Sequence, residues 1–309
     1  MKTQSVKISA GFILICLLWG STWLAIKIGL EEFPPMLAAG LRFSLASIFI
    51  FFFMHFRSVP IQKDKLSIKL YLIMGIFSFV IPFGLVYWAE QYIPSGLASI
   101  LFGSFPFFVI LFSKFSLPKE SVDIFKILGV TIGFIGIVVI FSDDSTLNFT
   151  LNLWGMLAVI LSAAMQGGIA VIIKKHGNHL NPLSMNFIPL VIGGIVLVIL
   201  GLLFEKTTNL NYTMPAVLSI FYLAFFGTLI TFTTYYWLMK RMNVVILSLS
   251  SFISPIVAVI LGWLFISEKL SERDLIGSSL VLIGILFANF IGLKNYFIEH
   301  KKGKDDKHY

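Results

Sequence analysis

Ten apolar stretches run through almost the whole chain, and they constrain its fold more than any other feature. One helix needs about 20 apolar residues to cross a bilayer, so ten spans leave room only for short loops and tails. A soluble protein of 309 residues with 58% hydrophobic and 12% charged residues could not cover that much apolar surface. An outer-membrane barrel is excluded as well, because its strands alternate apolar and polar residues. We therefore predict an all-α membrane protein with ten transmembrane helices at 8–29, 35–56, 69–89, 94–114, 123–141, 152–173, 182–204, 215–238, 243–266 and 273–293.

Lysine and arginine residues are distributed unevenly between the two sets of loops that these spans create. Basic residues near span ends stay on the cytoplasmic side, whereas acidic residues have little influence. One set of loops, with both tails, carries 18 of the 23 basic residues, and the opposite loops carry only Lys206, Lys269 and Arg273. We therefore expect both termini in the cytoplasm, with 294–309 as a basic cytoplasmic tail. The net charge of +8 then reports topology, and a nucleic-acid partner for the tail is the weaker alternative.

The two halves of the chain resemble each other at an offset near 148 residues. Corresponding pairs include Trp19-Gly20 with Gln166-Gly167, Pro106 with Pro255, and Gly136 with Gly284. Each half, 8–141 and 152–293, holds five spans, and an odd number means that the second half enters the membrane from the opposite side. Inverted repeats are the architecture of secondary transporters, in which two halves rock about a site near the bilayer midplane. The repeat predicts a transporter that works by alternating access.

Several segments also resemble a known family. They are Leu18 to Lys27, Pro34-Pro35 with Arg42-Phe43, Ala89 to Gly96, Pro106 to Glu120, and Pro255 through Glu268 to Gly277 and Gly284. These segments are similar to two EamA repeats of the drug/metabolite transporter superfamily. The resemblance implies a ten-span carrier with both termini inside, which moves amino acids, metabolites or drugs, often outward.

Three charged residues, Lys27, Arg42 and Glu90, lie at or near membrane depth. A charge there costs about 3 kcal/mol or more, so such residues are candidates for function. Lys27 or Arg42 would bind a substrate carboxylate or phosphate, and Glu90 would carry a proton near the outer mouth. The structural alternatives are a pair of Arg42 with Glu31, Glu32 or Glu90, a Lys27 that reaches the outer surface, and a Glu90 that faces water.

Aromatic and polar residues on the expected interface helices are further candidates for substrate binding. Trp19 and Trp23 are four residues apart and so share one helix face. The other candidates are Tyr87, Trp88, Ser99, Gln166, Asn186, Tyr235, Tyr236, Ser248 and Ser251. The alternatives are an interfacial belt for the aromatic residues and helix–helix hydrogen bonds for the polar ones.

Proline and glycine residues suggest where the helices bend and pack. Pro106 and Pro255 fall in the middle of corresponding spans, as two hinges or as static kinks. Small-residue faces at Gly129, Gly133, Gly136, Gly277 and Gly284 predict close helix packing, with a homodimer seam as an alternative.

These features favour a secondary transporter in the cell membrane, here a bacterial cytoplasmic membrane, that exports a small neutral, zwitterionic or anionic metabolite such as an amino acid. Its partners would be that substrate and the lipid bilayer, with no cofactor and no metal. A multidrug or cationic-compound efflux carrier is the main alternative. A membrane-embedded lipid-modifying enzyme is less favoured, because Asp143-Asp144 and the pair His176 and His179 fall on opposite sides of the membrane.

Overall fold

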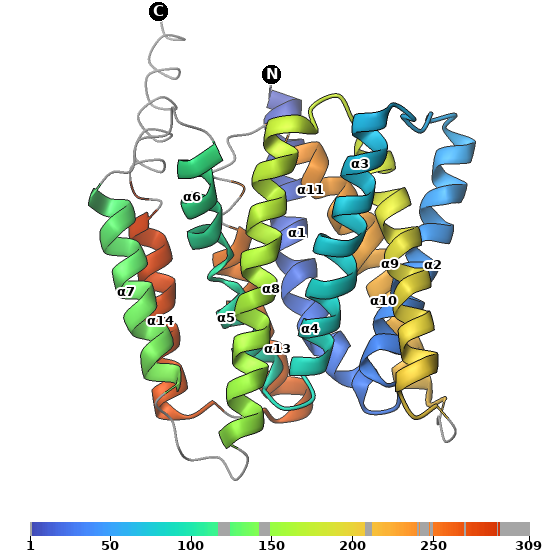
Figure 1. Ribbon diagram of the computed structural model, residues 1–309. Helices are drawn as coiled ribbons and strands as arrows, with labels where there is room; N and C mark the ends of the chain where they lie inside the picture. Colours follow the sequence, from blue (N-terminus) through green and yellow to red (C-terminus); the bar gives the residue numbers. More distant parts are fainter. Residues whose placement is uncertain are drawn as a thin grey trace, which may run out of the picture.

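The computed structural model shows a bundle of helices (Figure 1), and no β-strand occurs among the residues that it describes. These residues are 2–116, 124–141, 149–207, 212–239, 241, 247, 250–268, 270–288 and 290. The first half forms α1 (Lys2–Leu30), α2 (Pro35–Phe56), α3 (Lys65–Met74), the π-helix η1 (Gly75–Val80), α4 (Ile81–Ala89), α5 (Ser95–Phe102), α6 (Phe105–Ser116) and α7 (Ile124–Phe141). The second half forms α8 (Phe149–His176), α9 (Pro182–Phe204), α10 (Met214–Ala224), the π-helix η2 (Phe225–Ile230), α11 (Thr231–Met239), α13 (Ser250–Ile266) and α14 (Glu272–Ala288).

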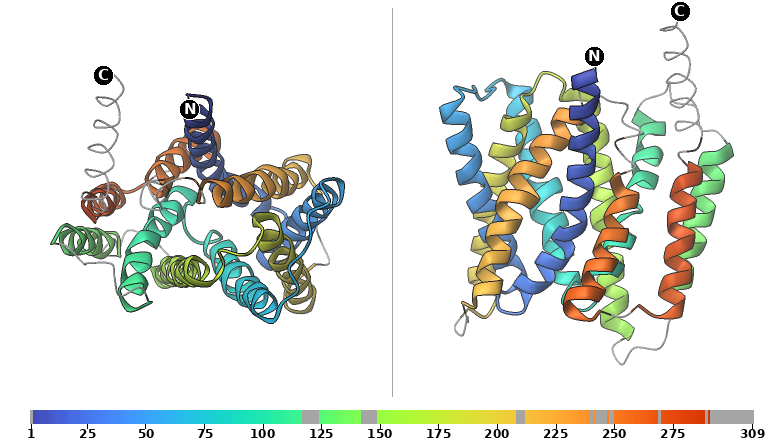
Figure 2. Two further views of the ribbon diagram at one scale, coloured as in Figure 1. Left: turned by 90° about the horizontal axis from the view of Figure 1, so that it is seen from above. Right: turned by 180° about the vertical axis from the view of Figure 1, so that it is seen from behind.

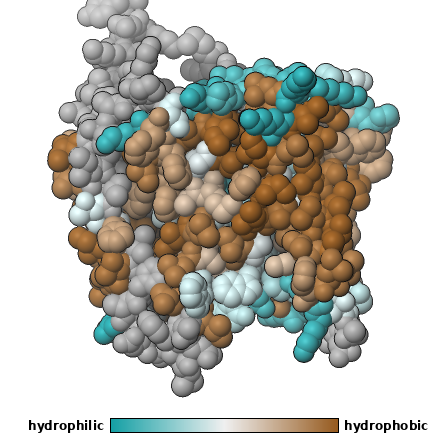
Figure 3. All heavy atoms as spheres, in the orientation of Figure 1, coloured by the Kyte–Doolittle hydropathy of each residue, from teal (hydrophilic) through white to brown (hydrophobic). Residues whose placement is uncertain are grey.

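Seven helical stretches in the described part of the chain are long and apolar enough to cross a membrane. They are Val6–Leu30, Pro35–Phe56, Lys65–Ala89, Ser95–Ser116, Leu151–His176, Pro182–Phe204 and Met214–Met239. Two shorter apolar helices, Ile253–Ile266 and Leu275–Gly284, fall within the ninth and tenth expected spans, and α7 covers the fifth with 18 residues. Large apolar side chains such as Phe56 and Phe204 are about 80% exposed, and Figure 3 shows an apolar belt between two hydrophilic rims. Lipid would cover such a belt, so the chain is a multi-pass membrane protein.

The two halves repeat the same order of elements and run through the bundle in opposite directions. In Figure 1, α1 begins at the edge where the N-terminus lies, and α14 ends at that same edge, which we call the terminal edge. α8, the first helix of the second half, begins at the opposite edge, which we call the far edge. The halves also interlock, because α2 packs against α9, α1 against α13, and α4 against α8. The two halves therefore share extensive helix contacts within the described residues.

Two helices of the first half are capped at the far edge by glutamates of the second half. α2 and α5 follow Pro34 and Pro94, which offer no side-chain cap. Glu205, just after α9, accepts the backbone N–H groups of Met36 at 2.8 Å and Leu37 at 3.0 Å. A carboxylate at a helix N-terminus satisfies free N–H groups and interacts favourably with the helix dipole.

Glu268, between α13 and α14, caps α5 in the same way. Its carboxylate accepts the backbone N–H of Ser95 at 2.8 Å, the hydroxyl of Ser95 at 2.7 Å and the N–H of Gly96 at 3.3 Å. The two glutamates therefore hold the two halves together on the far edge.

Glycines allow α7 and α14 to pack backbone against backbone at one end of the bundle (Figure 2). A Cβ atom added at Gly136 would lie 2.5 Å from the carbonyl oxygen of Gly277, and one at Gly284 would collide with the backbone of Gly133. The predicted close packing thus occurs within the chain, and these glycines are buried in that contact. They do not form a free seam for a second copy.

The proline and π-helical positions show where the sequence prediction was incomplete. The fourth expected span breaks after Phe102, and Pro106 is the second residue of α6, so the break lies just before this proline. Pro255 lies inside α13 and Pro189 lies inside α9, a position that we did not predict. The π-helices η1 and η2, at corresponding places in the two halves, were not predicted either.

Candidate functional site

A cavity of about 160 Å³ lies at the centre of the bundle, between the two halves. Its walls come from α1, α2, α4, α5 and α6 of the first half and from α8, α11 and α13 of the second. Most of its lining is apolar: Trp19, Trp23, Ile26, Phe83, Val86, Phe102, Phe105, Ile169, Ala170, Ile173, Phe232, Met239 and Pro255, with Gly103. Its polar lining residues are Thr22, Arg42, Ser99, Gln166, Tyr235, Tyr236, Ser250 and Ser254. Such a mixture is typical of small-molecule sites, in which a few polar groups orient the ligand.

The two tryptophans of α1 contact opposite halves of the chain across the cavity. The ring of Trp19 lies 5.0 Å from that of Tyr235 and 5.9 Å from that of Phe232, both on α11. The ring of Trp23 lies 5.6 Å from that of Phe102 on α5. The shared face that the four-residue spacing predicts is therefore turned toward the cavity, where aromatic contacts hold the tryptophans.

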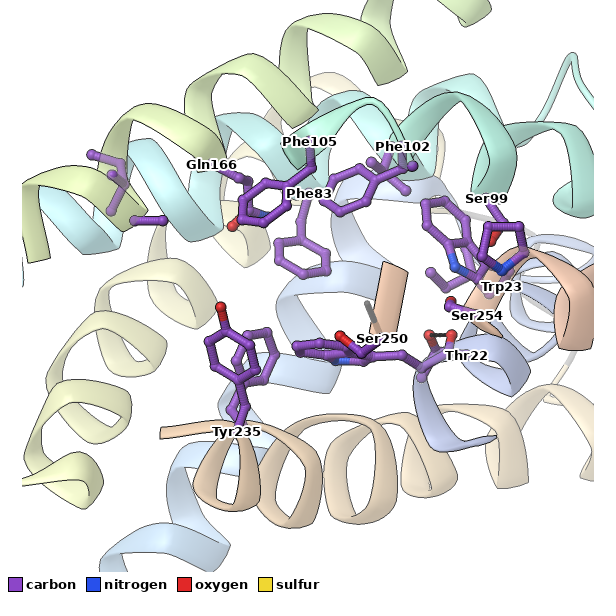
Figure 4. Close-up of a pocket in the computed structure, with 18 of the residues that line it drawn as sticks. Thr22, Trp23, Phe83, Ser99, Phe102, Phe105, Gln166, Tyr235, Ser250 and Ser254 are labelled. Atoms are coloured by element: carbon purple, nitrogen blue, oxygen red, sulfur yellow. Dashed lines mark hydrogen bonds between the residues drawn. The ribbon is translucent and has the colours of Figure 1, made fainter. Parts of the chain in front are cut away.

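Polar side chains lie on facing walls of the cavity, as Figure 4 shows. The amide of Gln166 on α8 and the hydroxyl of Tyr235 on α11 lie toward one end, and Ser99 on α5 lies toward the other. Ser99 is only 2% exposed, and its hydroxyl has no hydrogen-bond partner in the described part of the structure. A buried hydroxyl without a partner is costly, so Ser99 is suited to bind a polar group of a ligand.

Arg42 brings a positive charge to the cavity wall. It is 2% exposed and donates hydrogen bonds to the hydroxyl of Thr228, the hydroxyl of Tyr87 and the carbonyl oxygen of Gly227. The carbonyl and the Thr228 hydroxyl belong to η2. The alternative that Arg42 pairs with Glu31, Glu32 or Glu90 is not found among the described residues, because all three hydrogen bonds of Arg42 go to neutral groups.

Lys27 and Glu90 form a polar layer about one helical turn beyond the cavity, toward the far edge. Lys27 lies four residues after Trp23, and Glu90 lies four residues after Val86, so each follows a lining residue on the same helix face. Lys27 donates to the backbone carbonyl oxygens of Glu90 at 2.5 Å and Ile93 at 3.2 Å, so it caps the end of α4 and does not simply extend to the surface.

The carboxylate of Glu90 is fully buried, so it does not face water, and neither of its oxygens has a hydrogen-bond partner in the described structure. The charged groups that act on it electrostatically are Lys27, Glu268 and Arg42, from three different segments. Because desolvation penalises a lone buried carboxylate, this position is unusual for a purely structural acid.

Some of the predicted residues do not line the cavity. Tyr87 lies behind Arg42, Trp88 packs against Tyr92 with ring centroids 5.1 Å apart, and Asn186 is buried and donates to the carbonyl oxygen of Pro182. Pro106 is buried in α6 outside the cavity. Ser248 lies outside the described residues, and the side chain of Ser251 is not described.

Other lining residues were missed by sequence reasoning. Thr22, Phe83, Ser250 and Ser254 line the cavity, and Glu268 and Glu205 cap α5 and α2 at the far edge. Thr22 and Ser254 could have been predicted from helix periodicity. Thr22 directly precedes Trp23, and Ser254 lies about one turn after Ser251, and both neighbours were predicted to line the site. In the described residues, no group of three or more His, Cys, Asp or Glu side chains could hold a metal ion.

An interlocked helical bundle with an apolar belt and a central mixed cavity defines a multi-pass membrane transporter. The model of the EamA-like transporter family matches residues 7–142 and 153–290, and the chain belongs to this family. The two matched segments are the two halves described above, so the family resemblance seen in the sequence is confirmed.

Three bacterial relatives match most of the chain, and two of them are named as transporters. The chain is 29% identical over 287 residues to the uncharacterized transporter YoaV of Bacillus subtilis. This alignment covers 92% of this chain and 97% of the relative. The chain is 28% identical over 282 residues to the protein PagO of Salmonella typhimurium, covering 91% and 92%. It is 27% identical over 291 residues to the uncharacterized inner membrane transporter YedA of Escherichia coli, covering 92% and 90%.

A solved crystal structure shares the fold, with a TM-score of 0.69 and 20% sequence identity over 93% of this chain and 98% of the other. This likeness extends over both halves of the bundle.

Proposed function

We propose that this chain is a ten-span secondary transporter that moves a small metabolite by alternating access, with the central cavity as its substrate site. The observation that carries the proposal is the cavity itself, whose polar groups come from both halves of an inverted repeat. A ligand at such an interface is exposed to one side of the membrane and then to the other as the halves rock. Membership of a transporter family supports the same reading.

We place the terminal edge in the cytoplasm. Among the described residues it carries Lys7, Arg57, Lys63, Lys65, Lys69, Lys114, Lys174, Lys175 and Arg241, whereas the far edge carries Lys27, Lys206 and Arg273. This asymmetry supports cytoplasmic termini by the positive-inside rule. The inner membrane named for the Escherichia coli relative supports a bacterial cytoplasmic membrane.

We propose that the substrate is neutral, zwitterionic or anionic, and that it is exported, as the family resemblance implies. No Asp or Glu lines the cavity in the described structure, so a cation would find no counter-charge there. The aromatic walls formed by Trp19, Trp23, Phe83 and Phe102 favour one second candidate, efflux of aromatic or cationic drugs, because ring faces attract cations.

The experiment compares metabolites inside and outside cells that lack the protein or overproduce it. Overproduction should lower the internal level of one compound and raise its external level, and Trp19→Ala or Gln166→Ala should abolish this effect at normal protein levels. Trp154→Ala is the matched control, because Trp154 on α8 is 56% exposed on the lipid-facing surface. Full transport by both cavity variants would refute the assignment of the cavity. Export of ethidium, with no change in any metabolite, would favour the drug-efflux alternative.

A further inference from the structure

Arg42 makes three hydrogen bonds within the protein, but two of them are long. A guanidinium carries five N–H donors. The hydrogen bond from Nε to Thr228 is 2.9 Å long, whereas those from Nη1 to Tyr87 and from Nη2 to Gly227 are both 3.3 Å, beyond the usual range. Two further N–H groups take part in no hydrogen bond within the described structure. Each of Nη1 and Nη2 therefore keeps one N–H donor for a ligand carboxylate, beside the long bonds to Tyr87 and Gly227.

Two aromatic rings lie beside this guanidinium. Its Cζ atom lies 5.1 Å from the ring centre of Phe83 and 5.4 Å from that of Phe43. Phe83 itself lines the cavity. A cation stacked on ring faces keeps its charge poorly hydrated, so an anion that enters the cavity would meet a strong and oriented field.

The described cavity lining holds no acid that pairs directly with Arg42, and Glu90 acts on it only from outside the lining. Its lining contains neither Asp nor Glu among the described residues, and the carboxylate of Glu90 makes no hydrogen bond to the guanidinium. A buried charge at membrane depth is expensive without a partner. A hydrogen-bonded anionic partner for Arg42 would therefore have to come from a ligand in the cavity.

The second half has no equivalent cation. At offsets of 147 and 148 residues, Arg42 corresponds to Pro189 and Leu190, which are buried and apolar. The pseudo-symmetric cavity is thus electrostatically one-sided. Lys27, the other nearby cation, is occupied by two backbone carbonyls and does not line the cavity.

We propose that Arg42 binds the carboxylate of a substrate with a single carboxylate group, whose apolar body lies against the rings of Trp19, Trp23 and Phe102. This proposal rests on the function proposed above and specifies the substrate class of the same cavity. One guanidinium with two remaining N–H donors matches one carboxylate, whereas a doubly charged phosphate ester would require a second cation. The free hydroxyl of Ser99 would bind an additional polar group of the substrate, such as an ammonium or hydroxyl group, without a second charged side chain of the protein.

The test measures binding of matched acids and amides to the purified full-length protein in lipid nanodiscs, by isothermal titration. The pairs are 3-phenylpropanoate with its amide, hexanoate with its amide, L-leucine with L-leucinamide and L-phenylalanine with L-phenylalaninamide, and phenyl phosphate serves as the divalent anion. At least one acid should bind about 10- to 100-fold more tightly than its amide, since a charge-assisted pair with a buried group is lost in the amide. Arg42→Gln should reduce that preference to less than about 3-fold by weakening the acid alone.

Two further variants keep the test decisive. Arg241→Gln, at an exposed arginine of the terminal edge, should leave the preference unchanged. Arg42→Lys keeps the charge without the planar fork of donors, so it should bind the acid about 10-fold more weakly than the wild type. This variant tests the proposal if Arg42→Gln does not fold. The proposal is overturned if no acid of the panel binds, if every amide binds as tightly as its acid, if phenyl phosphate binds most tightly, or if the Arg42 variants keep the preference.

Trp19→Ala separates this proposal from the proposed function. Weaker binding of acids and amides alike in this variant, together with no effect of Arg42, would retain the cavity as the substrate site and reject only the role of Arg42. Unchanged binding in the Trp19 and Arg42 variants would reject both.

Discussion

Glu268→Gln should weaken the contact that closes the far edge of the bundle. The wild-type carboxylate accepts two short hydrogen bonds from Ser95, at 2.7 and 2.8 Å, and one long bond from Gly96. A hydrogen bond to a charged group contributes about 1.5–3 kcal/mol, and a neutral one about 1 kcal/mol. Glutamine keeps one acceptor oxygen, but its amide NH2 group would face N–H or O–H donors of Ser95 and Gly96, with which it cannot form the lost hydrogen bonds. The expected loss, discounted for partial exposure, is about 2–4 kcal/mol.

A loss of this size shifts the balance between a state closed at the far edge and a state open there. If the contact is absent from the open state, its population relative to the closed state rises about 30- to 1000-fold. The assay uses a protein whose only cysteine, Cys16, is replaced by alanine and in which Ser99, a cavity residue, is replaced by cysteine. A membrane-impermeant maleimide added to intact cells should label this cysteine at least about ten times faster in the Glu268→Gln variant.

Glu272→Gln is the matched control for that experiment. Glu272 is the first residue of α14, is exposed, and lies four residues further along the same edge. Its substitution removes the same charge and should leave the labelling rate unchanged. Equal labelling rates in the two variants, or a lower melting temperature of Glu268→Gln without faster labelling, would refute the argument that this carboxylate closes the far edge.

Three further predictions concern packing, topology and coupling. Gly20→Val should destabilise the protein by about 1–3 kcal/mol and slow transport, because even a Cβ atom added at Gly20 would lie 2.6 Å from Cγ1 of Val257 on α13. An unchanged melting temperature of this variant would contradict the packing argument. Cysteines at Lys63 and Lys206 should be labelled from the inside and the outside respectively, and the reverse pattern would exclude the proposed orientation. A pH gradient should change substrate flux into proteoliposomes that contain the wild type, and Glu90→Gln should abolish this response. The reason is that a buried carboxyl group is the usual proton carrier in a transporter. A Glu90→Gln variant that still responds to the gradient would exclude Glu90 from proton coupling.

The helices were predictable from the sequence, but their irregularities were not. Apolar stretches and short polar breaks locate the helices to within a few residues, as for the span expected at 35–56 and observed as Pro35–Phe56. The π-helices depend on tertiary contacts. In η2 the hydroxyl of Thr228 bonds back to the carbonyl of Leu223, five residues earlier, while its oxygen also accepts from Arg42, which is 186 residues distant. No local pattern in the sequence reports such a contact.

The site was predictable where helix periodicity alone decides orientation. Trp19 and Trp23 line the cavity as their spacing indicates. Tyr87 corresponds to Tyr236 in the repeat, yet only Tyr236 lines the cavity, because the hydroxyl of Tyr87 is occupied by Arg42. Repeat symmetry thus predicts which positions correspond, but it does not predict the hydrogen bonds that each side chain makes. A charged residue present in only one half, such as Arg42, binds a neighbouring side chain whose counterpart in the other half lines the cavity.

The order of synthesis gives the capping glutamates a consequence for how the protein is made. α2 and α5 emerge from the ribosome and enter the membrane well before Glu205 and Glu268, which follow their partners by about 170 residues. Until then, the first N–H groups of both helices lack their caps, and such groups are costly to leave unpaired near lipid. A first half produced alone would remain an unfinished folding intermediate, exposed to quality-control proteases. Co-expression of the second half as a separate chain should rescue it, so the two halves mature together rather than in succession.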